Sequence, residues 1–93
     1  MSKIIPIPLT PITIISYQLP VASDVELGVF NVLGQNVKTL VNGKQAADRY
    51  EIKWDGTNGI GQSVASGIYL YKLDVISERS QRFVETRKML LLR

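Results

Sequence analysis

The sequence of 93 residues contains no cysteine and no histidine. Without cysteine there is no disulfide framework, no thiolate nucleophile and no zinc–thiolate site. Without histidine the chain lacks the commonest general base and the commonest metal ligand. Catalysis would have to rely on carboxylates, Lys or Tyr alone, so we expect a protein that is not an enzyme and that uses no metal and no cofactor.

Long hydrophobic runs are also missing, since no apolar stretch approaches the roughly 20 residues that span a bilayer. The opening segment MSKIIPIPLTPITII carries one Lys, but three prolines interrupt it and no small-residue cleavage site follows. We therefore predict no signal peptide. If the domain is exported, either the export signal is expected upstream or the domain itself serves a later step of export. Residues 1–11 are predicted to be a proline-bearing N-terminal arm, and residues 12–93 to be one domain.

Composition fits a small globular domain, with 45% hydrophobic and 20% charged residues. The formal net charge of +3 is concentrated near the C-terminus, where Glu85 is the only acidic residue after position 78. The basic residues there are Arg79, Arg82, Arg87, Lys88 and Arg93. Such an end could contact nucleic acid or anionic lipid. Because the charges alternate with apolar residues, we favour a solvated strand face and expect no nucleic acid partner.

The apolar residues repeat with the period of β-strands. TIISYQL, residues 13–19, is rich in β-branched and aromatic residues and is closed by Pro20. In DVELGVFNVL the apolar residues alternate with others, and YEIKW sets Trp54 on its apolar face as the expected core anchor. Turns are predicted at LGQN, residues 33–36, and at Asn42-Gly43. The chain is predicted to be all-β, a single Ig-like antiparallel β-sandwich of six to seven strands.

The glycine-rich stretch GTNGIGQS, residues 56–63, differs by one residue from the phosphate-binding pattern G-x-x-x-x-G-K-[ST]. Gln62 replaces the Lys, and a strand pattern follows where the phosphate loop needs a helix, so the nucleotide hypothesis fails. Calcium could use oxygens of Asp55 and Asn58, but only one carboxylate is offered. We expect a structural loop in which Asx side chains bind backbone amides. Its structural residues are predicted to be Asp55, Gly56, Asn58, Gly61 and Gly67.

Several motifs resemble a known family over residues 8–93. They are FNVLGQ, the pattern Y-E-x-K-W-D-G-x-N-x-x-G-Q-x-V-A-S-G-x-Y and the final KMLLLR. The chain resembles the C-terminal sorting domain, type A, of the type IX (Por) secretion system. It equally resembles the Ig-like module related to the flagellar hook-capping protein. Departures include Ile7 and Thr10 where the family has asparagines, Asp48 where it favours Gly, and Gly28 where a β-branched residue is expected.

The resemblance to the sorting domain implies an address label on exported cargo, in a Gram-negative bacterium of the Bacteroidetes type. The cargo would pass through the periplasm and end secreted or on the cell surface. The implied partners are the outer-membrane translocon and a sortase-like peptidase. The recognition residues carried over from the family are Lys88, Met89, Leu90, Leu91, Leu92 and Arg93. An apolar and basic terminal strand could also pair at a sheet edge and form a homo-oligomer.

Other hypotheses remain open at this point. Leu90 and Leu92 could fill the sandwich core while Leu91 packs on the other side. The domain could be a structural protein–protein interaction module of the hook-cap or adhesin type, which predicts association without export. Carbohydrate binding through Trp54, Tyr69 and Tyr71 would need these aromatic rings exposed on one face, and exposure of Trp54 would decide that hypothesis.

Overall fold

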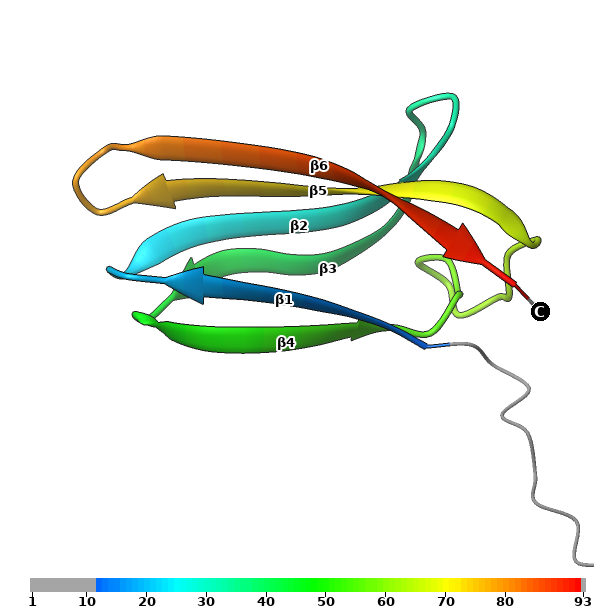
Figure 1. Ribbon diagram of the computed structural model, residues 1–93, viewed down its shortest axis with the longest axis horizontal. Coiled ribbons are helices and arrows are strands. Elements are labelled where there is room, and N and C mark those ends of the chain that lie inside the picture. The colour runs from blue at the N-terminus through cyan, green and yellow to red at the C-terminus, as the bar shows by residue number, and fades with distance from the viewer. Residues whose placement is uncertain (1–11, 93) are drawn as a thin grey trace, which may run out of the picture.

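The computed structural model describes residues 12–92, which form six β-strands (Figure 1). The strands are β1 (Thr13–Leu19), β2 (Ser23–Asn31), β3 (Asn36–Gln45), β4 (Asp48–Trp54), β5 (Gly67–Ser77) and β6 (Arg82–Leu91). Within these residues no helix is long and apolar enough to cross a membrane. The predicted arm, residues 1–11, and Arg93 lie outside the described residues, so the boundary at residue 12 stays a prediction.

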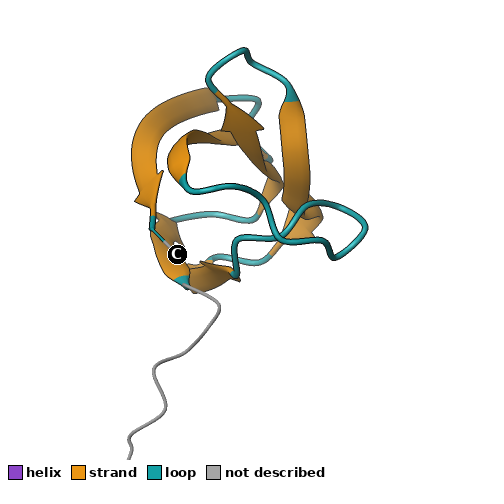
Figure 2. Ribbon diagram, turned by 90° about the vertical axis from the view of Figure 1, so that its right-hand side faces the viewer, coloured by secondary structure: helices purple, strands orange, loops and turns teal. Residues whose placement is uncertain are grey.

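The strands form two antiparallel sheets of unequal width. β1 and β4 make a two-stranded sheet, and the four-stranded sheet has the order β3-β2-β5-β6. Seen along the strands, the two sheets enclose a common interior (Figure 2). This arrangement confirms the predicted antiparallel sandwich. Each strand has one inward face, which explains the period of two in the apolar residues.

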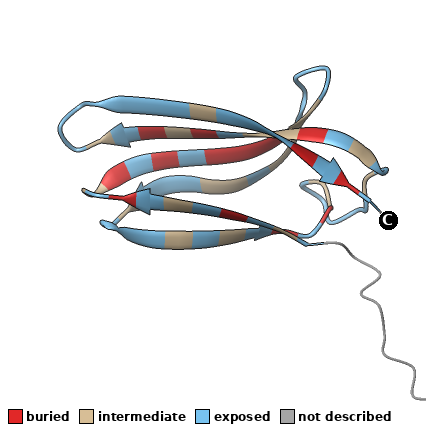
Figure 3. Ribbon diagram, viewed as in Figure 1, coloured by how far each residue is buried: buried red, intermediate tan, exposed pale blue. Residues whose placement is uncertain are grey.

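The core is made by the inward side chains of both sheets. Along β2 the buried positions alternate from Ser23 to Leu27, and Gly28 and Val29 are buried as well (Figure 3). Trp54, the predicted anchor, is 1% exposed and belongs to this core. The buried apolar residues are Ile15, Leu19, Val25, Leu27, Val29, Trp54, Tyr69, Leu73, Val75, Met89 and Leu91. Every sheet strand except β3 contributes to this set, so the domain has a single shared core.

The turn predicted at Asn42-Gly43 is wrong. Both residues lie within β3, where they pair with Glu26 and Val25 of β2. The ladder between β2 and β3 continues to Gln45, so cross-strand pairing outweighs the local turn preference of the dipeptide. The turn predicted around LGQN does connect β2 to β3, and Gly34 there has a φ of 81°.

Candidate functional site: the C-terminal strand

The proposed recognition residues lie at the C-terminal end of β6, and their orientation follows from pairing with β5. Met89 lies opposite Tyr69, Leu90 opposite Ile68 and Leu91 opposite Gly67. Because successive side chains of a strand point to opposite faces, this segment is divided between the core and the surface.

Met89 and Leu91 point into the core, with exposed fractions of 8% and 1%. The hypothesis that Leu90 and Leu92 fill the core while Leu91 packs on the other side is therefore wrong. The four consecutive apolar residues Met89 to Leu92 give no sign in the sequence of which ones face inward. The register with β5, which the sequence does not reveal, decides it.

The outward side chains form an exposed surface that we call the outer β6 patch, defined as Ile68, Lys88, Leu90 and Leu92. Leu90 is 63% exposed and Leu92 68% exposed, and Ile68 from β5 is 46% exposed beside Leu90. Exposed neighbouring apolar side chains at a sheet margin are typical of interaction surfaces. Ile68 could not be predicted as part of this site, because its position beside Leu90 depends on the register between β5 and β6.

Part of the basic charge near the C-terminus is neutralised within the domain. Arg82 makes two hydrogen bonds to the carboxylate of Asp74, with Nη2 2.8 Å from Oδ2, and Arg87 pairs with Glu85. The hydrogen bond from Arg82 holds the pKa of Asp74 below its usual value. Within residues 12–92, Lys88 has no carboxylate at ion-pair distance and is exposed. Its charge is therefore available at the outer β6 patch.

The glycine-rich loop is held by Asx side chains. Asp55 Oδ1 accepts hydrogen bonds from Thr57 N at 3.2 Å and Thr57 Oγ1 at 2.5 Å. Asn58 Oδ1 accepts from the amides of Ile60 and Gln62, at 3.1 and 3.0 Å. The bond from Thr57, assisted by Lys38 Nζ at 3.7 Å, lowers the pKa of Asp55. These oxygens are already occupied by the loop's own donors.

The loop glycines occupy positions that other residues adopt at a cost. Gly56 and Gly61 have φ values of 75° and 83°, in the left-handed region. Gly67 begins β5 opposite Leu91. Among residues 12–92 no group of three or more acidic side chains could hold a metal ion.

The aromatic residues considered for carbohydrate binding are largely in the core. Trp54 packs edge-on against Tyr69, with ring centroids 5.2 Å apart, and Tyr69 is only 8% exposed. Trp54 Nε1 donates to the carbonyl of Thr57 at 2.9 Å. A buried ring cannot stack on a sugar, so the carbohydrate hypothesis is wrong for Trp54 and Tyr69. Tyr71 is partly buried and packs against the same core.

Comparison with known proteins agrees with this architecture. The FlgD Ig-like domain family matches residues 10–79, which is most of the chain. The chain belongs to the FlgD Ig-like domain family. Its structure is similar to the crystal structure of FLGD from P. aeruginosa, with a TM-score of 0.65 and 25% sequence identity. That similarity covers 86% of this chain and 60% of the other.

Further results limit what the comparison shows. No curated protein matches the sequence. The chain spans only 60% of the FLGD structure, so the activity of the whole FLGD protein does not transfer automatically. The matching family and the FLGD structure are not type IX sorting domains, and the family match ends at residue 79, before β6 begins. The FlgD-like half of the resemblance is confirmed. Lys88, Leu90 and Leu92 of the outer β6 patch lie beyond the matched segment, whereas Ile68 lies within it.

Proposed function

We propose that this chain is a non-catalytic protein–protein interaction module of the FlgD Ig-like type, as in a hook-cap assembly. The observation that carries the proposal is the outer β6 patch, in which exposed Leu90 and Leu92 stand on a strand anchored by buried Met89 and Leu91. Membership of the FlgD Ig-like domain family supports a structural role. Within residues 12–92, β6 lies at the margin of its sheet with β5 as its one neighbour, and such an edge strand can pair with a strand of another molecule.

Homotypic association through this edge is the direct test. Sedimentation equilibrium of the full chain should show a concentration-dependent dimer, and Leu90→Ser with Leu92→Ser should weaken it at least tenfold. The matched control is Ile14→Ser, because Ile14 is 53% exposed on β1, in the other sheet. A chain that stays monomeric at every concentration, or a control that weakens the dimer equally, contradicts association through the patch.

The second candidate is a type IX sorting signal, for which the translocon and a sortase-like peptidase are the proposed partners. The specific observation in its favour is that Lys88, Leu90 and Leu92 are exposed together, where a receptor can reach them. The destination would then be the cell surface or the medium, after passage through the periplasm.

Its test must leave the fold intact. Deletion of residues 88–93 also removes Met89 and Leu91 from the core, so loss of export by that variant would have two explanations. A better variant is Leu90→Ser with Leu92→Ser in a periplasm-targeted reporter fusion, expressed in a bacterium with type IX secretion. Surface delivery by the unsubstituted fusion and its loss in the variant would support sorting. Periplasmic retention of both fusions would exclude it and leave the interaction module.

A further inference from the structure

The edge of β6 that faces away from β5, here called the distal edge, carries backbone groups whose positions follow from the β5–β6 hairpin. No strand of residues 12–92 pairs with this edge. At the start of the hairpin the amide of Ser77 donates to the carbonyl of Gln81 at 2.8 Å, so these two residues are a hydrogen-bonded pair. Such pairs alternate along an antiparallel ladder. The odd-numbered residues of β6 therefore bond to β5, and the even-numbered residues direct their N–H and C=O groups to the distal edge.

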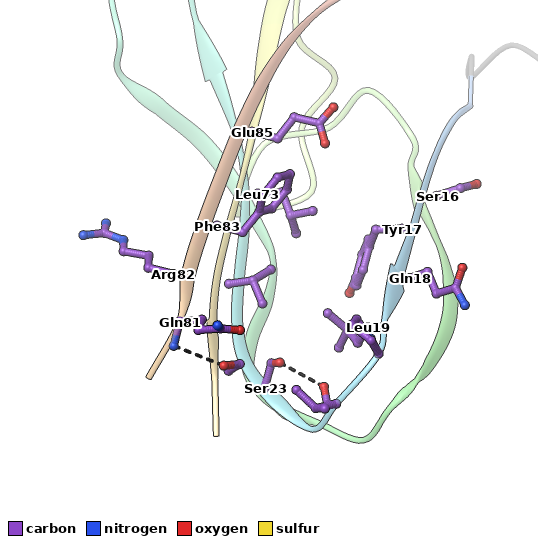
Figure 4. A pocket seen from close by; sticks show the side chains of 14 residues that line it. Ser16, Tyr17, Gln18, Leu19, Ser23, Leu73, Gln81, Arg82, Phe83 and Glu85 are labelled. Carbon is purple, nitrogen blue, oxygen red and sulfur yellow. Dashed lines mark hydrogen bonds between the residues drawn. The ribbon is translucent and has the colours of Figure 1, made fainter. Parts of the chain in front are cut away.

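The same alternation divides the side chains of β6 between its two faces. Phe83 and Glu85 point to one side of the strand and Arg82 to the other (Figure 4). Glu85 pairs with Arg87 on the first face, and Thr86, which lies between them in sequence, is exposed on the second. The strand therefore carries one acidic and one basic side chain at equal distances from Thr86.

A strand with this arrangement is complementary to itself. When two copies of one strand pair antiparallel about a twofold axis, the residue on the axis lies opposite itself, and residues equidistant from it lie opposite each other. With the axis at Thr86, Glu85 of each copy lies opposite Arg87 of the other, so two ion pairs cross between the copies. Thr86 directs its N–H and C=O groups to the distal edge, so the two threonines form a hydrogen-bonded pair. Residues 82–90 of each copy then lie opposite a residue of the other.

Other positions of the axis lack this complementarity. An axis at Glu85, Arg87 or Lys88 sets like charges directly opposite each other, which destabilises a strand pair. An axis closer to either end of β6, such as one at Val84, pairs fewer residues and brings no opposite charges together within the strand. Charge and length of overlap therefore both favour the axis at Thr86.

This axis also covers apolar side chains that one copy leaves exposed. Phe83, 55% exposed, lies opposite Met89 of the second copy, and sulfur–aromatic contacts are favourable. Leu90, 63% exposed, lies opposite Arg82 of the second copy, beside its aliphatic stem. We propose that two copies of this chain join through β6, antiparallel and with a twofold axis at Thr86, so that their four-stranded sheets become one continuous sheet. The inference rests on the proposed function and identifies the partner as a second copy.

Because the chain has no native cysteine, single substitutions report the position of the axis. Thr86→Cys should form a disulfide between two chains under mild oxidation at least tenfold faster than Val84→Cys or Lys88→Cys. All three positions are exposed on the same face, but Val84 and Lys88 each lie about 13 Å from their own copies, four residues along the strand. An equimolar mixture of Val84→Cys and Lys88→Cys should give mainly the mixed disulfide. Equal rates for the three variants, or fastest cross-linking at Val84 or Lys88, would overturn the proposed axis.

Exchange of charges tests the ion pairs on the chain without cysteine. Glu85→Arg and Arg87→Glu should each weaken the dimer at least tenfold in sedimentation equilibrium, because each sets like charges opposite each other. A mixture of the two variants, and the double variant that carries both substitutions, should restore association. A double variant that stays monomeric would contradict the ion pairs. A dimer without preference for Thr86 would overturn this axis and leave the proposed function intact, whereas an unsubstituted chain that is monomeric at every concentration would overturn both.

Discussion

The two ends of β6 show how the same strand pattern gives opposite burial. At one end Met89 and Leu91 point inward and are almost fully buried, whereas at the other Phe83 points inward and stays 55% exposed. We call the first the closed end, where Trp54, Tyr69, Met89 and Leu91 meet. The second is the open end, beside a groove of about 830 Å³ between β1 and β6. Residue type does not explain the contrast, because phenylalanine is at least as apolar as methionine.

The difference lies in what covers each end. At the closed end the loop between β4 and β5 supplies Val64, which packs against the core, and Thr57, whose carbonyl accepts the Trp54 hydrogen bond. At the open end β1 is the only strand of the small sheet near β6, and the groove separates them. Burial in this sandwich therefore depends on the loop as much as on strand alternation.

The largest expected effect is at the closed end. Trp54→Ala should lower the free energy of unfolding by about 3–5 kcal/mol, because it removes a large buried ring and leaves a cavity. Urea denaturation followed by circular dichroism measures the change. A loss below about 1 kcal/mol, the usual range for less disruptive substitutions, would show that the closed end is not the main source of stability.

Adjacent leucines of β6 sharpen the comparison between faces. Leu91→Ala should cost about 2–5 kcal/mol, since Leu91 is 1% exposed, whereas Leu90→Ala should change stability by no more than about 0.5 kcal/mol. Denaturation midpoints of the two variants test the phase of the strand. Equal losses would mean that β6 does not have the described register with β5.

A smaller effect is expected in the loop that covers the closed end. Gly61→Ala should destabilise the domain by about 1–2 kcal/mol, because Gly61 has a φ of 83° and a Cβ is disfavoured there. Gly59→Ala is the control, since Gly59 is not among the positive-φ glycines and a Cβ would meet nothing within 4 Å. If both variants lose the same stability, backbone strain is not the cause.

The smallest expected effect is on the pH dependence of stability. It involves one carboxylate at the closed end and one on β5. Asp55 at the closed end and Asp74 on β5 both have folded-state pKa values below the usual one, near 3.9. Each therefore contributes stability that is present above the unfolded pKa and is lost as pH falls through the folded pKa. Asp55→Asn and Asp74→Asn should each flatten the acid limb of a plot of stability against pH.

Salt should distinguish these two carboxylates. Asp74 is held mainly by charged Arg82 on an exposed face, whereas Asp55 is held mainly by neutral Thr57. High salt should weaken the contribution of Asp74 to stability more than that of Asp55, because screening acts on exposed ion pairs. Denaturation at pH 3–6 in low and high salt measures the difference. An equal salt response would contradict this assignment of causes.

The strands could be predicted from the sequence because the alternation of apolar and polar residues is a local pattern. TIISYQL matches β1 residue for residue, and Trp54 was identified as core from one alternating stretch. The orientation of KMLLL could not be predicted, since consecutive leucines give no phase and only the pairing of Leu90 with Ile68 sets it. The turn predicted at Asn42-Gly43 was wrong for a related reason, because the long ladder between β3 and β2 outweighs the local turn preference of this dipeptide. Sequence therefore predicts what depends on neighbours along the chain, and misses what depends on neighbours across the sheet.

The pairing of Ile68 with Leu90 has one more consequence. These residues are brought together only by the ladder between β5 and β6, so the outer β6 patch ceases to exist when the sheet unfolds. A partner that binds Ile68, Leu90 and Leu92 together therefore recognises the domain only when it is folded. Such a partner would not bind misfolded copies, so no separate chaperone would be needed to exclude them. Its measured affinity for each variant would fall with the fraction of molecules that remain folded.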